Sequence, residues 1–159
     1  MKISVKYLIL GILLFPLLPA AQELSFNREA GGIRIREGEK DVLFYRTGPN
    51  SADGSYERSN YIHPLYGLDG EVLTEDFPED HLHHRGVFWA WHQVLIGNKN
   101  MGDSWECRDF IWDVQEVELQ PSDSSLSLIS RILWKSSVYT DDSGKPAPFV
   151  EEQLRISIR

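Results

Sequence analysis

Leu154-Arg155-Ile156-Ser157-Ile158-Arg159 alternates apolar and polar residues up to the C-terminal residue. A period of two is typical of a β-strand with one buried and one solvated face. Short alternating or β-branched runs recur upstream and are separated by turn-forming clusters such as Gly48-Pro49-Asn50 and Asp142-Ser143-Gly144. We predict strands over residues 24–27, 33–36, 42–46, 61–66, 87–96, 110–119, 126–136 and 151–158, with a solvated hairpin over 139–148. No helical apolar stripe interrupts them, so the sequence predicts an all-β fold, an antiparallel β-sandwich.

Both ends of the chain carry expectations of their own. Because the last predicted strand continues to Arg159, we expect the sandwich to be truncated at the C-terminus and to be part of a larger supersandwich. At the other end, Lys2 and Lys6 precede an apolar run that ends in Ala20-Ala21, which predicts a signal peptide over residues 1–21. The mature domain, residues 22–159, is then expected to be secreted, periplasmic or extracellular, with no membrane span after cleavage.

The net charge argues against nucleic acid and anionic lipid as partners, and the cysteine content excludes an intramolecular disulfide. The chain has 16 basic and 24 acidic residues; without Lys2 and Lys6 the basic residues fall to 16 − 2 = 14, which gives a mature net charge of −10 with histidines neutral. Such a chain should repel nucleic acid and anionic lipid. Cys107 is the only cysteine, so no intramolecular disulfide forms and stability must come from the core. Nothing in the sequence around Cys107 suggests a nucleophile.

The histidines mark the candidate site. All five lie between His63 and His92, and three of them are His81, His83 and His84 within the stretch Asp80–Gly86. Imidazole titrates near neutral pH and is the commonest metal ligand in proteins. In an extended segment His81 and His83 share a face, so with His63 as third ligand they could hold a divalent metal ion, and Asp76, Glu79 or Asp80 could complete or orient the set. The alternative is a loop fixed by hydrogen bonds from its histidines.

Neighbouring residues extend this site. On a strand from Val87 to Ile96, His92 would share a face with apolar residues and be a hydrogen-bonded core histidine. Trp89 and Trp91 would take the other face, as core or as a platform for sugar rings.

Arg85 is predicted either as a clamp for a carboxylate or sugar hydroxyls or as a structural salt bridge to Asp76, Glu79 or Asp80. The loop with Asp103 and Trp105 is expected to close over the same pocket.

Three segments resemble a known family. Tyr61-Ile62-His63-Pro64-Leu65-Tyr66, the string from Asp76 to Gly86 and Phe88-Trp89-Ala90-Trp91 resemble the secreted bacterial family labelled methane oxygenase PmoA. The resemblance covers most of the mature chain and implies a longer β-rich domain of unknown activity, common in bacteria that degrade polysaccharides, of which this chain is the N-terminal half. It does not imply methane oxidation, because the PmoA subunit of methane monooxygenase is an integral membrane protein.

These features predict a carbohydrate-active protein. In the enzyme hypothesis His81, His83, His84, Asp80 and Arg85 are catalytic, moving protons on a saccharide or assisting a divalent metal ion held by His81, His83 and His63. Substrate would be bound by Trp89, Trp91, Arg85, His63 and Trp105. Two alternatives remain: a non-catalytic carbohydrate-binding module built on the tryptophans and Arg85, and a structural domain whose histidines fix a long loop to the sheet.

Overall fold

The computed structural model describes residues 23–159, so the predicted signal peptide lies outside the described residues. This part of the chain is all-β, as predicted, with antiparallel strands and no helix, and hence no helix long and apolar enough to cross a membrane. The strands are β1 (Leu24–Glu29), β2 (Gly32–Glu37), β3 (Lys40–Arg46), β4 (Asn50–Ala52), β5 (Ser55–Arg58), β6 (Tyr61–Leu65), β7 (Leu95–Ile96), β8 (Lys99–Asn100), β9 (Ile111–Ser122), β10 (Ser125–Thr140) and β11 (Pro146–Ile158).

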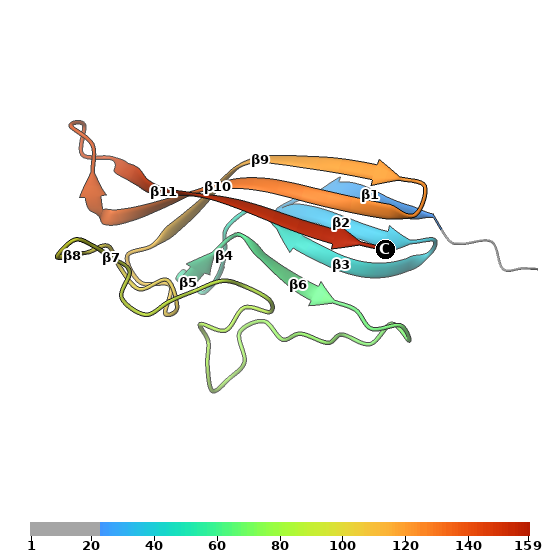
Figure 1. The fold of residues 1–159 in the computed structure, drawn as a ribbon. Coiled ribbons are helices and arrows are strands. Elements are labelled where there is room, and N and C mark those ends of the chain that lie inside the picture. The colour runs from blue at the N-terminus through green and yellow to red at the C-terminus, as the bar shows by residue number, and fades with distance from the viewer. Residues whose placement is uncertain (1–22) are drawn as a thin grey trace, which may run out of the picture.

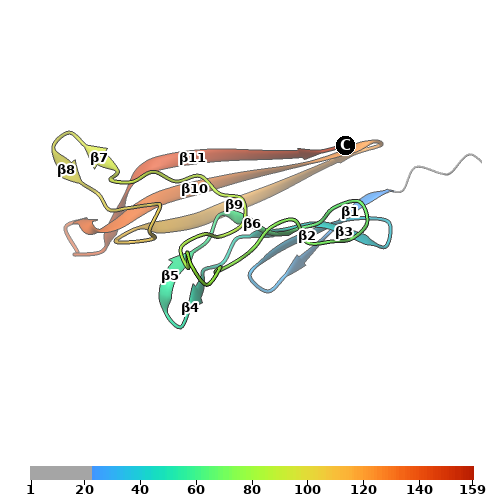
Figure 2. The same ribbon diagram turned by 90° about the horizontal axis from the view of Figure 1, so that it is seen from below.

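The two large sheets pack face to face, as expected for a sandwich (Figures 1 and 2). One has the order β1-β2-β3-β6 and the other β11-β10-β9, which leaves β6 and β11 each at a sheet edge. The β4–β5 and β7–β8 hairpins lie toward the end of the molecule away from the C-terminus (Figure 2).

Strand β10 shows why this sequence forms a sandwich. Every even-numbered residue from Leu126 to Ser136 is buried, and every odd-numbered one is only partly buried. Side chains alternate across a strand, so the even positions face the opposite sheet. Since β10 pairs with β9 on one side and β11 on the other, its buried row runs along the centre of its sheet.

Two hydrophobic clusters fill the interior, and β10 contributes to both. Leu126 and Leu128 pack with residues of the facing sheet in the first cluster, while Ile132 and Trp134 belong to the second. The other buried members of the first are Ile33, Ile35, Leu43 and Tyr45; those of the second are Phe110 and Trp112. The second cluster lies at the end that carries the candidate site.

The predicted strand over Val87–Ile96 is wrong. Only Leu95 and Ile96 form a strand, which pairs with β8, and Val87 makes a single bridge to Ile62. Residues 88–94 form an irregular segment. Two of its backbone carbonyls, those of Trp89 and Trp91, accept hydrogen bonds from the buried side chains of Arg58 and Ser104. The polar hairpin β4–β5 was not predicted. The hairpin around residues 139–148 is present, and its turn is closed by Asp141, which accepts backbone hydrogen bonds from Ser143 and Lys145.

Candidate functional site

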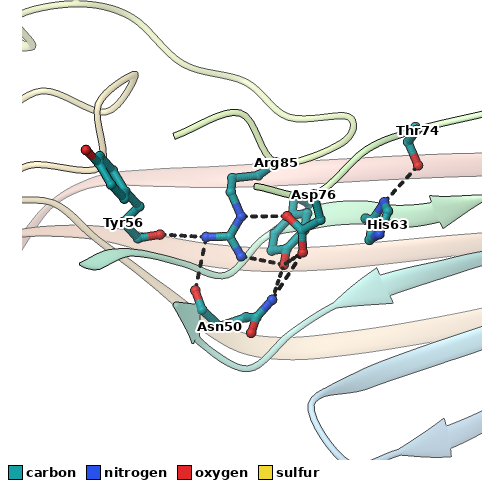
Figure 3. A network of polar contacts seen from close by, with 7 residues as sticks. Asn50, Tyr56, His63, Thr74, Asp76 and Arg85 are labelled. Atoms are coloured by element: carbon teal, nitrogen blue, oxygen red, sulfur yellow. Dashed lines mark hydrogen bonds and ion pairs between the residues drawn. The ribbon is translucent and has the colours of Figure 1, made fainter. Parts of the chain in front are cut away.

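Arg85 is the most deeply buried cation of the candidate site. Its side chain is 0% exposed. Nε donates to Asp76 Oδ1 at 2.6 Å, and Nη2 donates to the Tyr61 hydroxyl at 2.7 Å. Nη1 donates to the carbonyls of Asn50 at 3.0 Å and Tyr56 at 2.5 Å, so the guanidinium joins β4, β5, β6 and the long loop that follows (Figure 3).

Of the two roles predicted for Arg85, the structure contains the salt bridge to Asp76. The guanidinium is also covered by aromatic rings, with its carbon 3.7 Å from the Phe77 ring centroid and 4.8 Å from that of Tyr61. A clamp would need an exposed donor, and Arg85 offers none in this conformation. Glu79 and Asp80, the other predicted partners, are exposed and form no ion pair with it.

Gly86 lets the histidine loop lie directly on β6. Its φ is +74°, and a Cβ built there would lie 2.2 Å from the carbonyl oxygen of Ile62. That oxygen accepts a hydrogen bond from Val87 N at 3.0 Å, and Ile62 N donates back to the Val87 carbonyl. Only glycine satisfies both the conformation and the close approach.

His63 belongs to a separate polar contact. Its Nδ1 lies 3.0 Å from Thr74 Oγ1 (Figure 3). The same oxygen also accepts a hydrogen bond from Leu65 N. The threonine hydroxyl is therefore free to donate to Nδ1 of a neutral ring. Burial lowers the pKa of His63, which favours the same neutral form.

His81, His83 and His84 do come together, as a cluster of rings around Trp105. The rings of His81 and His84 stack at 4.8 Å between centroids, and His83 packs edge-on against His84 at 4.6 Å. Trp105 contacts His83 at 6.0 Å and His84 at 5.4 Å. The Trp105 loop thus packs against these two histidines, and its closure over a ligand pocket stays a prediction. Burial, and then the neighbouring histidines, lower the pKa of His83.

His92 is not a core residue, contrary to the sequence prediction. Its side chain is 60% exposed, and its Nδ1 lies 2.9 Å from Asp103 Oδ2. The prediction failed because it assumed a regular strand through this segment. Asp103 is itself fixed by two backbone hydrogen bonds, from Trp105 N and Glu106 N, so the carboxylate orients the imidazole. His92 also touches Trp105 at 5.8 Å, which extends the histidine cluster.

The predicted metal ligands do not form a compact set. Between residues 23 and 159, the one group of three candidate ligands whose atoms lie within 4.8 Å of one another is His92, Asp103 and Glu106. His81, His83 and His63 are not such a group. Two of its carboxylates already have partners, because Asp103 contacts His92 and Glu106 pairs with Arg108. A metal ion remains a prediction from the sequence.

Trp89 and Trp91 are both on the surface. Their side chains are 65% and 54% exposed, and their indole planes are nearly parallel, at 8° with centroids 6.3 Å apart. Trp91 rests on Trp134 of the second core cluster at 5.5 Å. Of the two fates predicted for these residues, core or platform, the exposed arrangement is the one present.

Two buried residues that the sequence did not single out hold this tryptophan segment. Arg58, 1% exposed, donates to the Trp89 carbonyl at 2.6 Å and to the Ser104 carbonyl at 3.0 Å. The Ser104 hydroxyl, in turn, accepts from Trp91 N at 2.9 Å and donates to the Trp91 carbonyl at 3.0 Å. No sequence motif marks either residue, because both act on backbone atoms far away along the chain.

Arg58 has no ion-pair partner within the part of the chain that the structure describes. Its guanidinium lies between the rings of Trp112 and Phe88, at 3.9 and 4.4 Å. Burial lowers the pKa of Arg58 to about 10, so it remains protonated at neutral pH. Burial also raises the pKa of the adjacent Cys107 thiol, which favours its neutral form.

A small pocket opens beside Trp89. Its volume is about 220 Å³, and it is lined by Tyr45, Tyr61, Ile62, Val87, Phe88, Trp89, Glu152 and Leu154. It lies where β6 and β11, the edges of the two sheets, face each other. A larger cavity of about 570 Å³ near the turn between β9 and β10 contains none of the predicted site residues.

The comparisons with known proteins identify a family. A family model described as a family of unknown function (DUF6807) matches residues 32–159. The chain belongs to this family. The matched part of this DUF6807 member contains every strand from β2 to β11 and all the site residues described above. Neither the search of curated proteins nor the search of solved structures found a match.

Proposed function

We propose that this DUF6807 protein binds a saccharide on the surface formed by Trp89 and Trp91. The observation that carries the proposal is that the backbone beneath two exposed indoles is held by hydrogen bonds from buried side chains. Exposed tryptophan forfeits the free energy of burying a large apolar surface. Here two such residues lie side by side, and a buried arginine and a buried serine bind their carbonyls.

Indole faces suit a sugar ring. The apolar C–H side of a pyranose stacks on the ring, while hydroxyl groups at its rim remain free to hydrogen-bond. Because Arg58 and Ser104 hold the backbone, little conformational entropy would be lost when a ligand binds. The sequence resembles a protein family that is common in polysaccharide-degrading bacteria, which supports the same ligand class. The PmoA label of that family contributes no activity to the proposal.

A glycan-binding measurement tests the proposal. Tag-free protein would be applied to an array of plant and bacterial oligosaccharides, and hits would be quantified by titration calorimetry. We expect W89A and W91A each to weaken binding by about tenfold or more, as is common for aromatic anchors. F26A, which removes an exposed aromatic side chain from β1, is the matched control and should bind like the wild type. Equal affinities in all four proteins would refute the tryptophan surface.

A second candidate function, proton transfer on the bound sugar, is favoured by the His92–Asp103 pair. A carboxylate that fixes one ring nitrogen leaves the other available as a general base or acid. His81, His83 and His84 lie in the same ring cluster, and Asp80 contacts His81 at 3.0 Å, so the predicted catalytic histidines remain candidates. Turnover of a bound glycan that disappears in H92A, with binding retained, would support an enzyme.

A further inference from the structure

The pocket beside Trp89 contains one carboxylate that the sequence analysis did not consider. Glu152 lies on β11, the edge strand of its sheet, and lines the pocket together with apolar and aromatic side chains. It forms no ion pair with any residue from 23 to 159. No cation from these residues therefore neutralises its charge in the pocket.

One oxygen of Glu152 is fully engaged. Oε2 accepts from Trp134 Nε1 at 2.7 Å and from Asn60 Nδ2 at 3.0 Å. Asn60 is fixed in turn, because its Oδ1 accepts from the Tyr45 hydroxyl at 2.7 Å, and that hydroxyl lies 3.0 Å from Ser130 Oγ. The carboxylate is therefore held by donors from β10 and from the residue before β6, and it is oriented before any ligand arrives.

The other oxygen is free. Oε1 has no hydrogen-bond partner among the described residues, and it does not belong to their fully buried unpartnered atoms, so it remains accessible. An accessible carboxylate oxygen accepts hydrogen bonds and offers none at neutral pH. It can satisfy sugar hydroxyls, but it repels an incoming carboxylate or sulfate.

Resting on the proposed function, we infer that Glu152 makes this pocket selective for an uncharged sugar ring and excludes acidic sugars. Trp89 is shared between the platform and the pocket, so a ring stacked there would present its rim to Oε1. The pocket volume of about 220 Å³ lies below the range of drug-sized ligand sites, roughly 300–1,000 Å³, and fits one ring. The net charge of the chain has the same sign as Glu152 and adds to the exclusion.

Matched pairs of oligosaccharides test this selectivity. Oligogalacturonide, oligomannuronate and heparosan fragments would each be compared with their carboxyl-reduced forms, which replace CO₂⁻ by CH₂OH and leave the linkages unchanged. We expect the wild type to bind at least one reduced form about tenfold or more tightly than its acidic partner. In E152Q, whose amide oxygen can still accept from Trp134 and Asn60, that preference should fall below about threefold.

The neighbouring residue provides the control. Glu151 is exposed on the opposite face of β11 and pairs with Arg131, so E151Q removes the same charge without changing the pocket. It should keep the wild-type preference. Circular dichroism would confirm that each variant is folded, and a wild type that lacks the preference overturns the role of Glu152 even if E152Q does not fold.

The outcomes separate the two proposals. Binding that needs Trp89 but shows no preference between paired ligands, or the same preference in E152Q, overturns the role of Glu152 and leaves the saccharide surface intact. A wild type that favours the acidic partner overturns it as well. Failure to bind any reduced form overturns the inference, and binding unaffected by both W89A and W91A overturns the saccharide surface and the inference together.

Discussion

At the scale of single residues, Arg85 shows how a residue marked by sequence can serve the fold. Its donors reach one carboxylate, one hydroxyl and two carbonyls on four segments of the chain. Replacing it with Met leaves Asp76 buried without a cation, which typically costs about 3–5 kcal/mol. We expect R85M to lose stability of this order in urea unfolding.

Two comparisons make that result specific. R85M/D76N should recover part of the loss, since no unpaired charge remains, whereas R131M, which removes an exposed ion pair, should stay within about 0.5 kcal/mol of wild type. If Arg85 were instead a ligand clamp, R85M would keep the wild-type stability and lose glycan binding.

Histidine protonation should weaken the fold. The pKa of His63 is lowered by burial, and that of His83 by burial and by neighbouring histidines, so folding favours the neutral form of both rings. A depressed folded pKa means that stability is fully present above the unfolded value, about 6.5, and is lost as pH falls through the folded value.

The free energy of unfolding should therefore decrease between pH 7.5 and 5.5, measured by urea titration at several pH values. H63Q and H83Q remove the titrating group and should each give a shallower pH dependence. Parallel curves for the wild type and both variants would contradict this account.

At the scale of elements, the regular alternation of apolar and polar residues predicts the long strands correctly, whereas the irregular segments were not predicted from the sequence. β10 and β11 carry their own burial pattern in sequence, so both strands are expected over 126–136 and 151–158, although they extend further, over Ser125–Thr140 and Pro146–Ile158. The segment from Val87 has the composition of a strand, but Arg58 and Ser104 bind its carbonyls, and nothing local in the sequence records that competition. The β4–β5 hairpin had a usable signal in Asp53-Gly54, a turn-forming pair.

The same distinction holds for the site. A histidine string is visible in any sequence, and its three rings do cluster. Glu152 carries no such mark, because it is one acidic residue among 24 and its importance comes from Trp134 and Asn60, which reach it from other segments. A residue whose role depends on contacts with distant segments cannot be identified from the spacing of residue types along the sequence.

The attachment of the histidine loop to β6 should depend on Gly86. In G86A the methyl group meets the Ile62 carbonyl, and the left-handed conformation adds about 1–2 kcal/mol, so we expect a loss of several kcal/mol in urea unfolding. Gly144 has a similar φ, +79°, with nothing within 4 Å of its hypothetical Cβ. G144A should therefore cost only the conformational part. Equal losses in the two variants would mean that close packing at Gly86 is unimportant.

At the scale of the whole molecule, β10 links the two hydrophobic clusters. Its Leu128 belongs to the first, and its Trp134 to the second. Neither cluster is complete without this strand, so we expect them to unfold together as one cooperative unit.

The five tryptophans provide a local reporter for this cooperativity, because all of them lie between residues 89 and 134, and none belongs to the first cluster. L128A opens a cavity in that first cluster and should cost about 2–5 kcal/mol. If the sandwich is one unit, the tryptophan fluorescence transition must shift by the same amount as the far-ultraviolet circular dichroism transition, although the substitution is remote from the indoles. A fluorescence midpoint that stays at the wild-type value while the dichroism midpoint falls would show that the candidate site is held by a cluster that folds independently of the rest of the sandwich.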